Sequence, residues 1–387
     1  MANDKQNTSP NVPNKGNVPR LRFPEFTEDW ATIRLGDYCD INMCKRIFAN
    51  QTSEIGDIPF YKIGTIGNIP DSYISKDLFE EYKHKYNYPR KGEVMITCSG
   101  TVGKAIVFNG EDSYYQDSNI VWIDNPTNKL ENMFLYYKIN CVDWSKLNST
   151  TITRIYNDDL RKLKISYPSI SEQIKITKLL QIIDDRIVTQ NKIIEQLQSL
   201  IKGIRYIIYT QLNCEWVQLS NLVVKGLITL KRGNVIPKYE YSDEYCYPVY
   251  SSSTQNGGLM GYFNTYMFDK SLISWSIDGG GNFFFRDKHK FNVTNVCGYL
   301  EADESKFDYR FISELLIYQH SRMVFDYQTK AHPSVIEAIY TLPILDLKKQ
   351  QCYSKLFEYI YIKLDRETSL LNKYEEQKKF LLSNMFI

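Results

Sequence analysis

The chain carries the same helical stripe twice, and this repetition constrains its fold more than any other feature of the sequence. Nine positions follow one another at alternating spacings of four and three residues, the spacing of a coiled-coil seam, and all but one are apolar. They are Ile176, Leu180, Ile183, Ile187, Gln190, Ile194, Leu197, Ile201 and Ile204. Adding 177 to each residue number gives a second stripe, at Tyr353, Phe357, Ile360, Leu364, Glu367, Leu371, Tyr374, Lys378 and Leu381. Isolated stripes are also found in core helices of bundles, but the repeated length favours two homologous helices that pair with each other.

Both stripes have a polar residue at the same central position, Gln190 in the first and Glu367 in the second. If the helices pair antiparallel, their midpoints coincide and the two side chains face each other. A polar pair within an apolar seam can fix the register of a coiled coil at some cost in stability. We therefore predict that Gln190 and Glu367 set the register, which requires them to lie within two helical turns of each other.

The segments that precede the two helices repeat more weakly, and a long internal repeat decides the architecture of a chain. Five short matches occur in the same order, with shifts in residue number between 175 and 189. They are Trp30 to Leu35 with Trp216 to Leu219, Pro59 to Tyr61 with Pro248 to Tyr250, Gly100 with Gly279, Asn119-Ile120 with Asn295-Val296, and Tyr167-Pro168 with Leu342-Pro343. Chance is a poor explanation for five matches in one order, so we expect two homologous halves.

Short apolar segments separated by Gly, Asn, Asp and Pro predict that each half begins with a strand-rich domain. The expected strands include residues 93–97, 105–108, 120–123, 272–277 and 282–285. The fold class is α+β, with two such domains, each followed by a long helix, and with the helices paired as an antiparallel coiled coil with pseudo-two-fold symmetry. We expect a disordered polar tail at 1–18, domains at 19–167 and 213–342, and helices at 168–212 and 343–387.

Composition excludes several classes of protein. The longest apolar runs are far too short to span a bilayer, and the first residues lack the apolar core of a signal peptide, so we expect a cytoplasmic protein. The eight cysteines form no C-x-x-C pair and the four histidines are scattered, which argues against a zinc site and for reduced structural thiols. A net charge of +2 neither supports nor excludes a nucleic-acid partner.

Four segments of the chain resemble the specificity subunits of type I restriction-modification systems, and the resemblance extends over nearly the whole chain from Pro19. The segments are Pro19 to Phe26 followed by Trp30, Gly92 to Lys104, Gln116 to Ile120, and Tyr167 to Ile176 with Asp184 to Ile187 following. The most specific signal is Glu172-Gln173 in the stretch that leads from Pro168 into the first helix. The second half, read from Pro343, lacks a Glu-Gln pair at the matching distance.

The resemblance implies two target-recognition domains and helices that bind methyltransferase subunits. It further implies that this chain bridges two such modification subunits, which use S-adenosylmethionine, and that restriction subunits, which hydrolyse ATP with Mg²⁺, join for cleavage. No cofactor is expected on this chain. No membrane partner is expected, and double-stranded DNA is the expected ligand.

The sequence offers no catalytic centre and no metal site of its own. The stretch Asp124 to Thr127 has one proline and no aromatic residue where an amino-methyltransferase would have N-P-P-[YF]. Residues 98–105 miss the P-loop pattern, because Cys98 stands at the first glycine and Ala105 at the metal-binding Ser or Thr. Gly279 to Gly281 lacks dinucleotide-binding spacing and is interpreted as a tight strand connection.

Loops rich in Lys, Arg, Asn, Gln, Ser and Thr are candidates for DNA contact, because base edges are read by hydrogen bonds and phosphates by charge. The candidates are Lys62, Thr65, Ser99, Thr101, Lys104, Thr151 and Arg154 in the first domain, and Ser252, Ser253, Gln255, Asn256, Gln328 and Lys330 in the second. We expect Lys62, Arg154 and Lys330 to contact phosphate or guanine. We expect Gln255, Asn256 and Gln328 to pair with adenine.

These features predict a reader of an asymmetric bipartite DNA site. Residues 172–209 would form a helix about 57 Å long, and two diverged domains on such a rod would read two unlike half-sites. The near-neutral charge predicts modest affinity of the chain alone for DNA. Geometry would serve a non-catalytic two-headed protein scaffold equally well, and sequence-dependent retention on DNA separates the two hypotheses. A fused endonuclease or methyltransferase is the third hypothesis, for which we find no motif.

Overall fold

The computed structural model describes residues 17–127, 129–147, 154–253, 255–278, 280–323 and 330–387. It divides into two compact units, one of Met1–Thr189 with Leu371–Ile387 and one of Gln190–Leu370. Of the tail expected at 1–18, residues 1–16 lie outside the described part. Thr151, Gln328 and Gly279, which the sequence singled out, also lie outside it.

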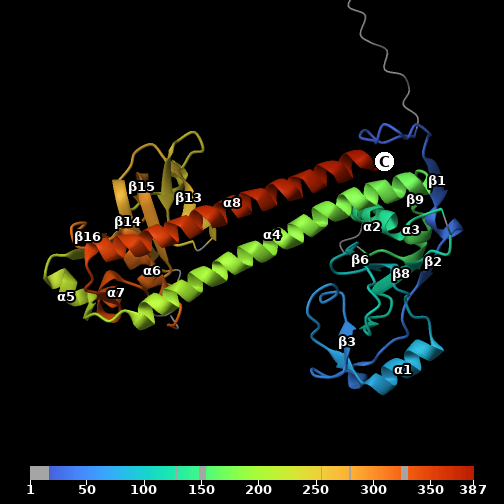
Figure 1. Cartoon of the computed structure of the whole chain (residues 1–387), viewed down its shortest axis with the longest axis horizontal. Coiled ribbons are helices and arrows are strands. Elements are labelled where there is room, and N and C mark those ends of the chain that lie inside the picture. Colours follow the sequence, from blue (N-terminus) through green and yellow to red (C-terminus); the bar gives the residue numbers. More distant parts are fainter. Residues whose placement is uncertain (1–16, 128, 148–153, 254, 279, 324–329) are drawn as a thin grey trace, which may run out of the picture. The chain divides into compact units, whose positions relative to one another are not determined.

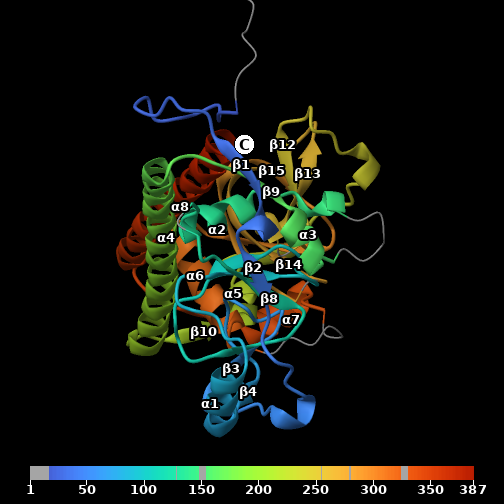
Figure 2. The same cartoon turned by 90° about the vertical axis from the view of Figure 1, so that its right-hand side faces the viewer.

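The first unit contains three small sheets together with the short helices α1, α2 and α3 (Figures 1 and 2). A four-stranded sheet has the order β2-β8-β5-β6, a three-stranded sheet has the order β4-β3-β7, and β1 pairs with β9. Figures 1 and 2 agree in placing α1 and β3 at the end of this unit away from α2, and Figure 2 shows β4 at the same end. The bounds are β1 (Ala31–Arg34), β2 (Asp40–Asn42), β3 (Ile58–Tyr61), β4 (Tyr73–Ile74), α1 (Lys76–Lys85), β5 (Val94–Thr97), β6 (Ala105–Val107), β7 (Tyr114–Tyr115), β8 (Ile120–Asp124), α2 (Asn132–Asn140), α3 (Asn157–Lys162), β9 (Lys164–Tyr167) and α4 (Ile170–Gln211).

The second unit contains one six-stranded sheet, with the order β11-β16-β14-β15-β12-β13, and the pair β10-β17. Its β15 takes the places of both β6 and β7, because it pairs antiparallel with β14 and parallel with β12. The bounds are β10 (Trp216–Gln218), α5 (Leu219–Val224), β11 (Ile228–Arg232), β12 (Tyr247–Tyr250), β13 (Leu259–Phe263), β14 (Phe268–Ser276), β15 (Phe283–Val293), β16 (Cys297–Ala302), α6 (Tyr309–His320), α7 (Pro333–Ile339), β17 (Thr341–Pro343) and α8 (Leu347–Met385).

The strand orders confirm the internal repeat and the α+β class, because β2-β8-β5-β6 in one unit corresponds to β11-β16-β14-β15 in the other. The expected strands are present, but the strand expected at 282–285 extends to Val293 and the one expected at 272–277 begins at Phe268. The match of Tyr61 with Tyr250 is also confirmed. The amide of Gln116 donates to Tyr61 O, and the amide of Thr294 donates to Tyr250 O, both at 2.9 Å.

Hydrogen-bond register corrects three of the sequence matches. The amide of Leu35 donates to Leu163 O and that of Leu219 to Tyr340 O, so the leucines are equivalent and the tryptophans are not. Likewise the amide of Cys98 donates to Asn119 O and that of Ile277 to Val296 O, so Asn119 matches Val296 rather than Asn295. The third correction makes Leu345, and not Pro343, the residue of the second half that is equivalent to Pro168. Loops of unequal length, aligned on single shared residues, produced these errors.

A buried glutamine shows the corrected register best. Gln173 accepts from the Glu131 amide (2.8 Å) and donates to Lys129 O (2.7 Å) and Pro168 O (2.9 Å). Gln350, its equivalent in the helical repeat, makes the same three bonds, to the Asp308 amide, Lys306 O and Leu345 O. The second half therefore keeps the glutamine of the Glu-Gln pair, and Lys349 replaces the glutamate.

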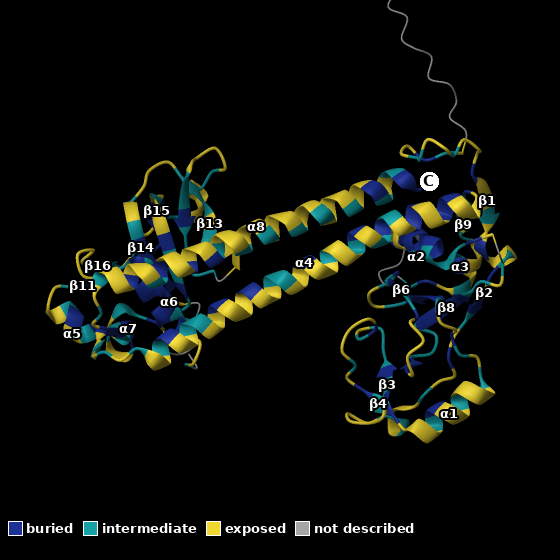
Figure 3. Ribbon diagram, viewed as in Figure 1, coloured by how far each residue is buried: buried dark blue, intermediate teal, exposed yellow. Residues whose placement is uncertain are grey.

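The two long helices pair antiparallel within each unit, as the stripes predict. In the first unit Asp184 contacts Lys378 and Arg186 contacts Tyr374, and in the second Gln190 contacts Glu367. All nine positions of each stripe are buried or half-buried, and exposed residues fill much of the remaining surface of both helices, except where they pack on the domains (Figure 3). The seam also contributes to each unit's core. Ile176, Leu180 and Ile183 pack with β5, β8 and α2 residues in the first unit, and Leu197, Ile201 and Ile208 with β14 and α6 residues in the second.

The predicted midpoint pair is in contact. Gln190 Nε2 donates to Glu367 O at 3.1 Å and to the Glu367 carboxylate, and Gln190 is 5% exposed. Breaking the hydrogen bonds of a buried amide is costly, which favours one alignment of the helices over its neighbours. That this pair sets the register remains a prediction.

Candidate nucleic-acid interface

Two of the predicted loops of the first unit are tied together. The turn at 62–65 is closed by the Lys62 amide, which donates to Thr65 Oγ1 at 3.0 Å. Lys104, at the end of the turn that joins β5 to β6, donates from Nζ to Ile66 O at 2.6 Å. Gly100 (φ +67°) packs so closely on Ile63 that a Cβ would come within 2.8 Å of that side chain. The two loops therefore form one surface.

A third segment joins this surface through backbone and side-chain bonds. The Ile155 amide donates to Cys98 O at 2.9 Å, and Arg154 Nη2 donates to Ser118 O at 3.2 Å. Ser99 Oγ donates to Asn119 Oδ1 at 2.7 Å. The structure thus brings Ser99 and Arg154 together from loops far apart in the sequence, with Thr101 exposed on the same turn.

The polar segment 116–119 lies in the same cluster, and the sequence analysis did not name its residues as DNA contacts. Gln116 Oε1 accepts from the Ile63 amide at 3.4 Å, and Asp117 forms an ion pair with Arg46 at 2.8 Å. Arg46 is exposed and adds a cation to this surface. A run of Gln, Asp, Ser and Asn directly before a buried strand is the signal that could have identified this segment.

The second unit repeats the arrangement with different side chains. Ser276 Oγ, at the end of β14, donates to Ser252 O at 2.9 Å, and Thr294 Oγ1 donates to Ser251 Oγ at 3.0 Å. The Ala331 amide donates to Ile277 O at 3.0 Å. Four segments of the chain, at 251–252, 276–277, 294 and 331, therefore meet beside the turn between β14 and β15.

Lys330 occupies the place of Arg154. The residue after each of them donates its backbone amide to the carbonyl just beyond a strand: Ile155 donates to Cys98 O after β5, and Ala331 donates to Ile277 O after β14. Lys330 Nζ forms an exposed ion pair with Asp278 at 3.1 Å. The two halves thus keep a cation at one position of the interface and vary its partners.

The loop between β12 and β13 ends in an unusual backbone. Asn256, Gly257 and Gly258 have φ values of 48°, 59° and 85°, a left-handed run that glycine adopts at little cost and asparagine tolerates. Gln255 and Asn256 are exposed at this turn, and Ser253 Oγ accepts from the Gln255 amide at 3.2 Å. Two exposed side-chain amides in a fixed turn are groups that can read adenine.

The interface offers hydrogen-bond donors, acceptors and cations, and no activated nucleophile is found in its described part. Burial raises the pKa of the Cys98 and Cys297 thiols to about 12, which keeps both protonated at neutral pH. Lys104 is engaged with a backbone carbonyl, in agreement with the interpretation of residues 98–105 as a turn. No cluster of three or more metal-binding side chains occurs among the described residues.

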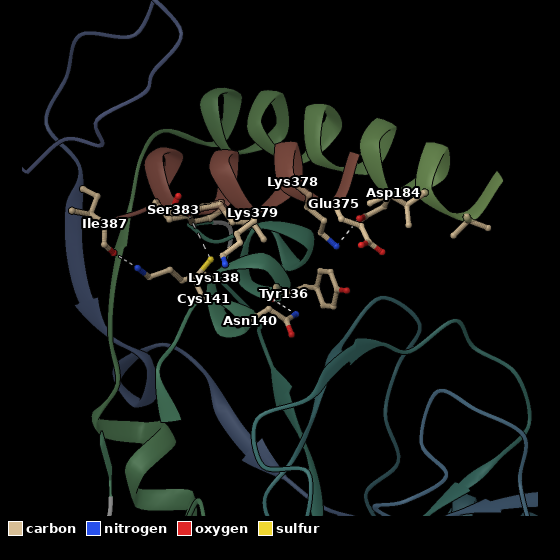
Figure 4. Close-up of a pocket in the computed structure, with 14 residues that line it drawn as sticks. Tyr136, Lys138, Asn140, Cys141, Asp184, Glu375, Lys378, Lys379, Ser383 and Ile387 are labelled. Carbon is tan, nitrogen blue, oxygen red and sulfur yellow. Dashed lines mark hydrogen bonds and ion pairs between the residues drawn. The ribbon is translucent and has the colours of Figure 1, made fainter. Parts of the chain in front are cut away.

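A second surface lies on the helices of the first unit. An open pocket of about 900 Å³ is bordered by α2, α4 and the last turns of α8 (Figure 4). Its wall combines apolar side chains with Lys138, Lys378 and Lys379, and Lys138 Nζ donates to Ile387 O. Burial lowers the pKa of Lys138, which is 8% exposed.

No helix of the described chain is long and apolar enough to cross a membrane.

Exposed apolar residues recur at one register of both long helices. Ile182 is 52% exposed on α4, and Tyr359, its equivalent in the second copy of the helical repeat on α8, is 68% exposed. Both lie outside the seam that joins the helices. An apolar side chain repeated in this way is a candidate for contact with a partner that binds twice.

Comparisons with known proteins agree with these features. A family model described as the type I restriction modification DNA specificity domain matches residues 27–199 and again 220–376. A Haemophilus influenzae protein provisionally named a type I restriction enzyme specificity subunit is 50% identical over 161 residues, which are 42% of this chain and 42% of that protein. The MpnII specificity subunit of Mycoplasma pneumoniae is 32% identical over 101 residues, which are 26% of this chain and 31% of that protein. Each match spans less than half of the relative.

Solved structures share the fold. The S subunit of a type I restriction-modification system from M. genitalium aligns with a TM-score of 0.68 at 18% identity, over 96% of this chain and 99% of that one. A structure described as concerning complex assembly and conformational transition of the type I R-M system aligns with a TM-score of 0.55 at 13% identity, over 92% and 97% of the two chains. At these identities the likeness is one of fold.

Proposed function

Because this chain belongs to the type I restriction-modification DNA specificity family, we propose that it selects the DNA sequence on which a multi-subunit modification complex acts. The observation that carries the proposal is the duplicated loop cluster beside the β5–β6 and β14–β15 turns. Each cluster joins four segments into one polar surface through hydrogen bonds. Such a surface has the donors and acceptors that sequence reading requires.

The two clusters differ in their side chains, so each domain reads a different half-site. The first offers Lys62, Thr65 and the Ser99 turn, whereas the second offers Gln255 and Asn256 on a left-handed turn. The recognised site is therefore asymmetric and bipartite. The domain bounds 19–167 and 213–342 are part of the same proposal.

The partners are two methyltransferase subunits, one for each copy of the helical repeat. Support comes from Ile182 and Tyr359, exposed at the same register, and from the pocket beside α2 with its apolar and basic wall. S-adenosylmethionine, ATP and Mg²⁺ belong to the partner subunits, and restriction subunits join for cleavage. The complex acts in the cytoplasm, and the chain itself is not an enzyme.

A two-headed protein scaffold is the alternative. It would use the same helices and the same repeat, but it would have no use for two clusters of hydrogen-bonding side chains that differ between domains. Retention on DNA that depends on sequence separates the two functions, because a scaffold gives none.

The test is to co-express the chain with its methyltransferase subunit and map methylated adenines across a genome by long-read sequencing. We expect one motif of two unlike half-sites. The double variant Gln255→Ala/Asn256→Ala should relax the motif in one half only, and Thr65→Ala serves as the matched change in the other domain. A stable complex that methylates without any motif would refute the proposal and favour the scaffold.

A further inference from the structure

A buried arginine in the second domain has no acidic partner among the residues that the structure describes. Arg286 lies on β15 and is 7% exposed. Its guanidinium is stacked on the Tyr250 ring, 3.6 Å from the ring centroid, and Nε donates to Ser274 Oγ at 2.8 Å. Among the ion pairs of the described residues, none includes Arg286. Burial lowers its pKa to about 10, so it stays charged at neutral pH.

Two other arginines that are largely buried do have the acidic partner that Arg286 lacks. Arg22 pairs with Glu172 at 2.8 Å, and Arg205 pairs with Glu314 at 2.6 Å, and each carboxylate is almost fully buried. Burying a charge without such a partner is expensive. Stacking and the hydroxyls of Ser274 and Tyr250 recover part of that cost but supply no negative charge, so the retained charge points to an anion that arrives from outside the chain.

The first domain has an apolar pair at the same place. Strand pairing aligns Met95 with Ser274 and Phe108 with Arg286, because Val94 pairs with Val107 as Ile273 pairs with Phe285. Met95 and Phe108 are buried in an aromatic cluster that extends to Tyr61, the equivalent of Tyr250. The fold therefore does not need a cation here, and only the second of the two domains has one.

Arg286 lies directly beneath the left-handed turn of the β12–β13 loop. A Cβ on Gly258 would come within 3.3 Å of Arg286 Nη2, and one on Gly257 within 3.8 Å of Nη1. The Ser251 and Ser253 carbonyl oxygens lie 3.0 and 3.2 Å from the same Cβ position on Gly258, and Gly257, which is exposed, has only Arg286 Nη1 within 4 Å of its Cβ position. An anion resting on that backbone would be within reach of a delocalised charge and of the turn's own amides.

We propose that Arg286 is an anion-binding residue of the second domain and that its anion is a backbone phosphate of the DNA held by the β12–β13 loop. A base edge is a poor fit, because reading bases in the major groove requires a side chain that projects from the surface. The Arg286 guanidinium instead stacks on the rings of Tyr250 and Phe284. The inference rests on the proposed DNA-reading function and adds to it a phosphate clamp that the first domain lacks.

The test uses the complex with its methyltransferase subunit and measures affinity for duplex DNA over a range of salt concentrations. Two neutral variants are Arg286→Gln and the pair Ser274→Met/Arg286→Phe, which copies the first domain and so is compatible with the fold. We expect the slope of log affinity against log salt to fall by about 0.9, the value for one phosphate contact. Affinity should fall on the order of 10-fold on target and unrelated DNA alike.

Two controls separate charge from structure. Arg286→Lys keeps the charge and should keep the slope, and Lys225→Met removes an exposed cation at the end of α5 and should leave slope and affinity unchanged. The midpoint of thermal unfolding of the neutral variants should equal or exceed that of the wild type, since they remove an uncompensated charge. A purely structural role predicts a lower midpoint instead.

The outcomes are distinct from those of the proposed function. An unchanged slope in both neutral variants, or an equal loss of slope in Arg286→Lys, overturns the phosphate contact. Relaxation of one base in the methylation motif with an unchanged slope also overturns it, and assigns Arg286 to base reading. If wild-type complex shows no bipartite motif, the proposed function fails whatever the slope.

Discussion

Two buried glutamine side chains, Gln173 and Gln350, fasten each globular domain to the helix that follows it. Each amide makes three hydrogen bonds with backbone groups, and each residue is at most 1% exposed. Because each amide satisfies one donor and two acceptors of the backbone, its removal leaves buried or part-buried groups unpaired. The bond pattern is the same in both halves.

We predict that Gln173→Leu and Gln350→Leu each lower the free energy of unfolding of their own unit by about 3 kcal/mol, since each unpaired buried group costs roughly 1–3 kcal/mol. Hydrogen exchange should show lost protection at the start of α2 in the first variant and of α6 in the second. Gln351→Leu, at the exposed neighbouring position, is the matched control. Equal loss of protection in both units from either single change would contradict the prediction.

Gln350 also shows how far sequence reading reaches at the scale of residues. The helical stripe gives a shift of 177 that finds it, whereas alignment on Pro343 gives a shift of 175 that misses it. Lys104 and Arg154 were identified from loop composition, and their bonds to Ile66 O and Ser118 O depend on contacts between distant segments. Composition finds polar loops, but it cannot tell which residues the fold uses to tie loops together.

At the scale of elements, a hydrogen bond from a tyrosine to a carboxylate joins each domain to a long helix. The tyrosine lies on the domain in the first unit and on the long helix in the second. Tyr137 on α2 donates to Asp184 on α4 at 2.7 Å in the first unit. In the second unit, Tyr361 on α8 donates to Glu314 on α6 at 3.2 Å. The helical register makes Tyr137 equivalent to Glu314 and Asp184 equivalent to Tyr361. Each domain is thus matched to its own helix.

A double-mutant cycle tests this matching. Glu314→Tyr places two tyrosines together and removes the carboxylate that pairs with Arg205 at 2.6 Å, so we expect a loss of about 3 kcal/mol of stability in the second unit. Adding Tyr361→Asp recreates the arrangement of the first unit and restores a carboxylate near Arg205. The double variant should recover at least about 1 kcal/mol relative to the sum of the single changes, measured by denaturant unfolding. Strictly additive effects would show that positions 314 and 361 contribute to stability independently, which would contradict the matching.

Elements were predicted from sequence to the extent that their signal is local. The 4-3 spacing identified both long helices, and short apolar segments identified strands such as the one expected at 93–97, which is β5 (Val94–Thr97). The joining of two short strands into the single β15, and the short link from β13 to β14 where the first unit has α1 between β4 and β5, were not predicted. Both depend on pairing between distant segments, which local pattern does not record.

At the scale of the whole molecule, duplication of the helical repeat predicts duplication of the partner. Ile182 and Tyr359 stay exposed although both are apolar, and each is equivalent to the other by the helical register. A charge placed at either position would be desolvated when a partner subunit covers it, at a cost that weakens that contact alone. Each helix position should therefore control one methyltransferase subunit.

We predict that the wild-type chain binds two methyltransferase subunits, that Ile182→Asp or Tyr359→Asp leaves one, and that the double variant leaves none, as counted by native mass spectrometry of co-expressed complexes. Asn191→Asp and Thr368→Asp are matched controls, because they add the same charge at equivalent exposed positions on the opposite face of each helix. Two subunits retained by the double variant would place the partner elsewhere on the chain. Loss of both subunits from a single change would mean that the two partners bind as one unit rather than independently.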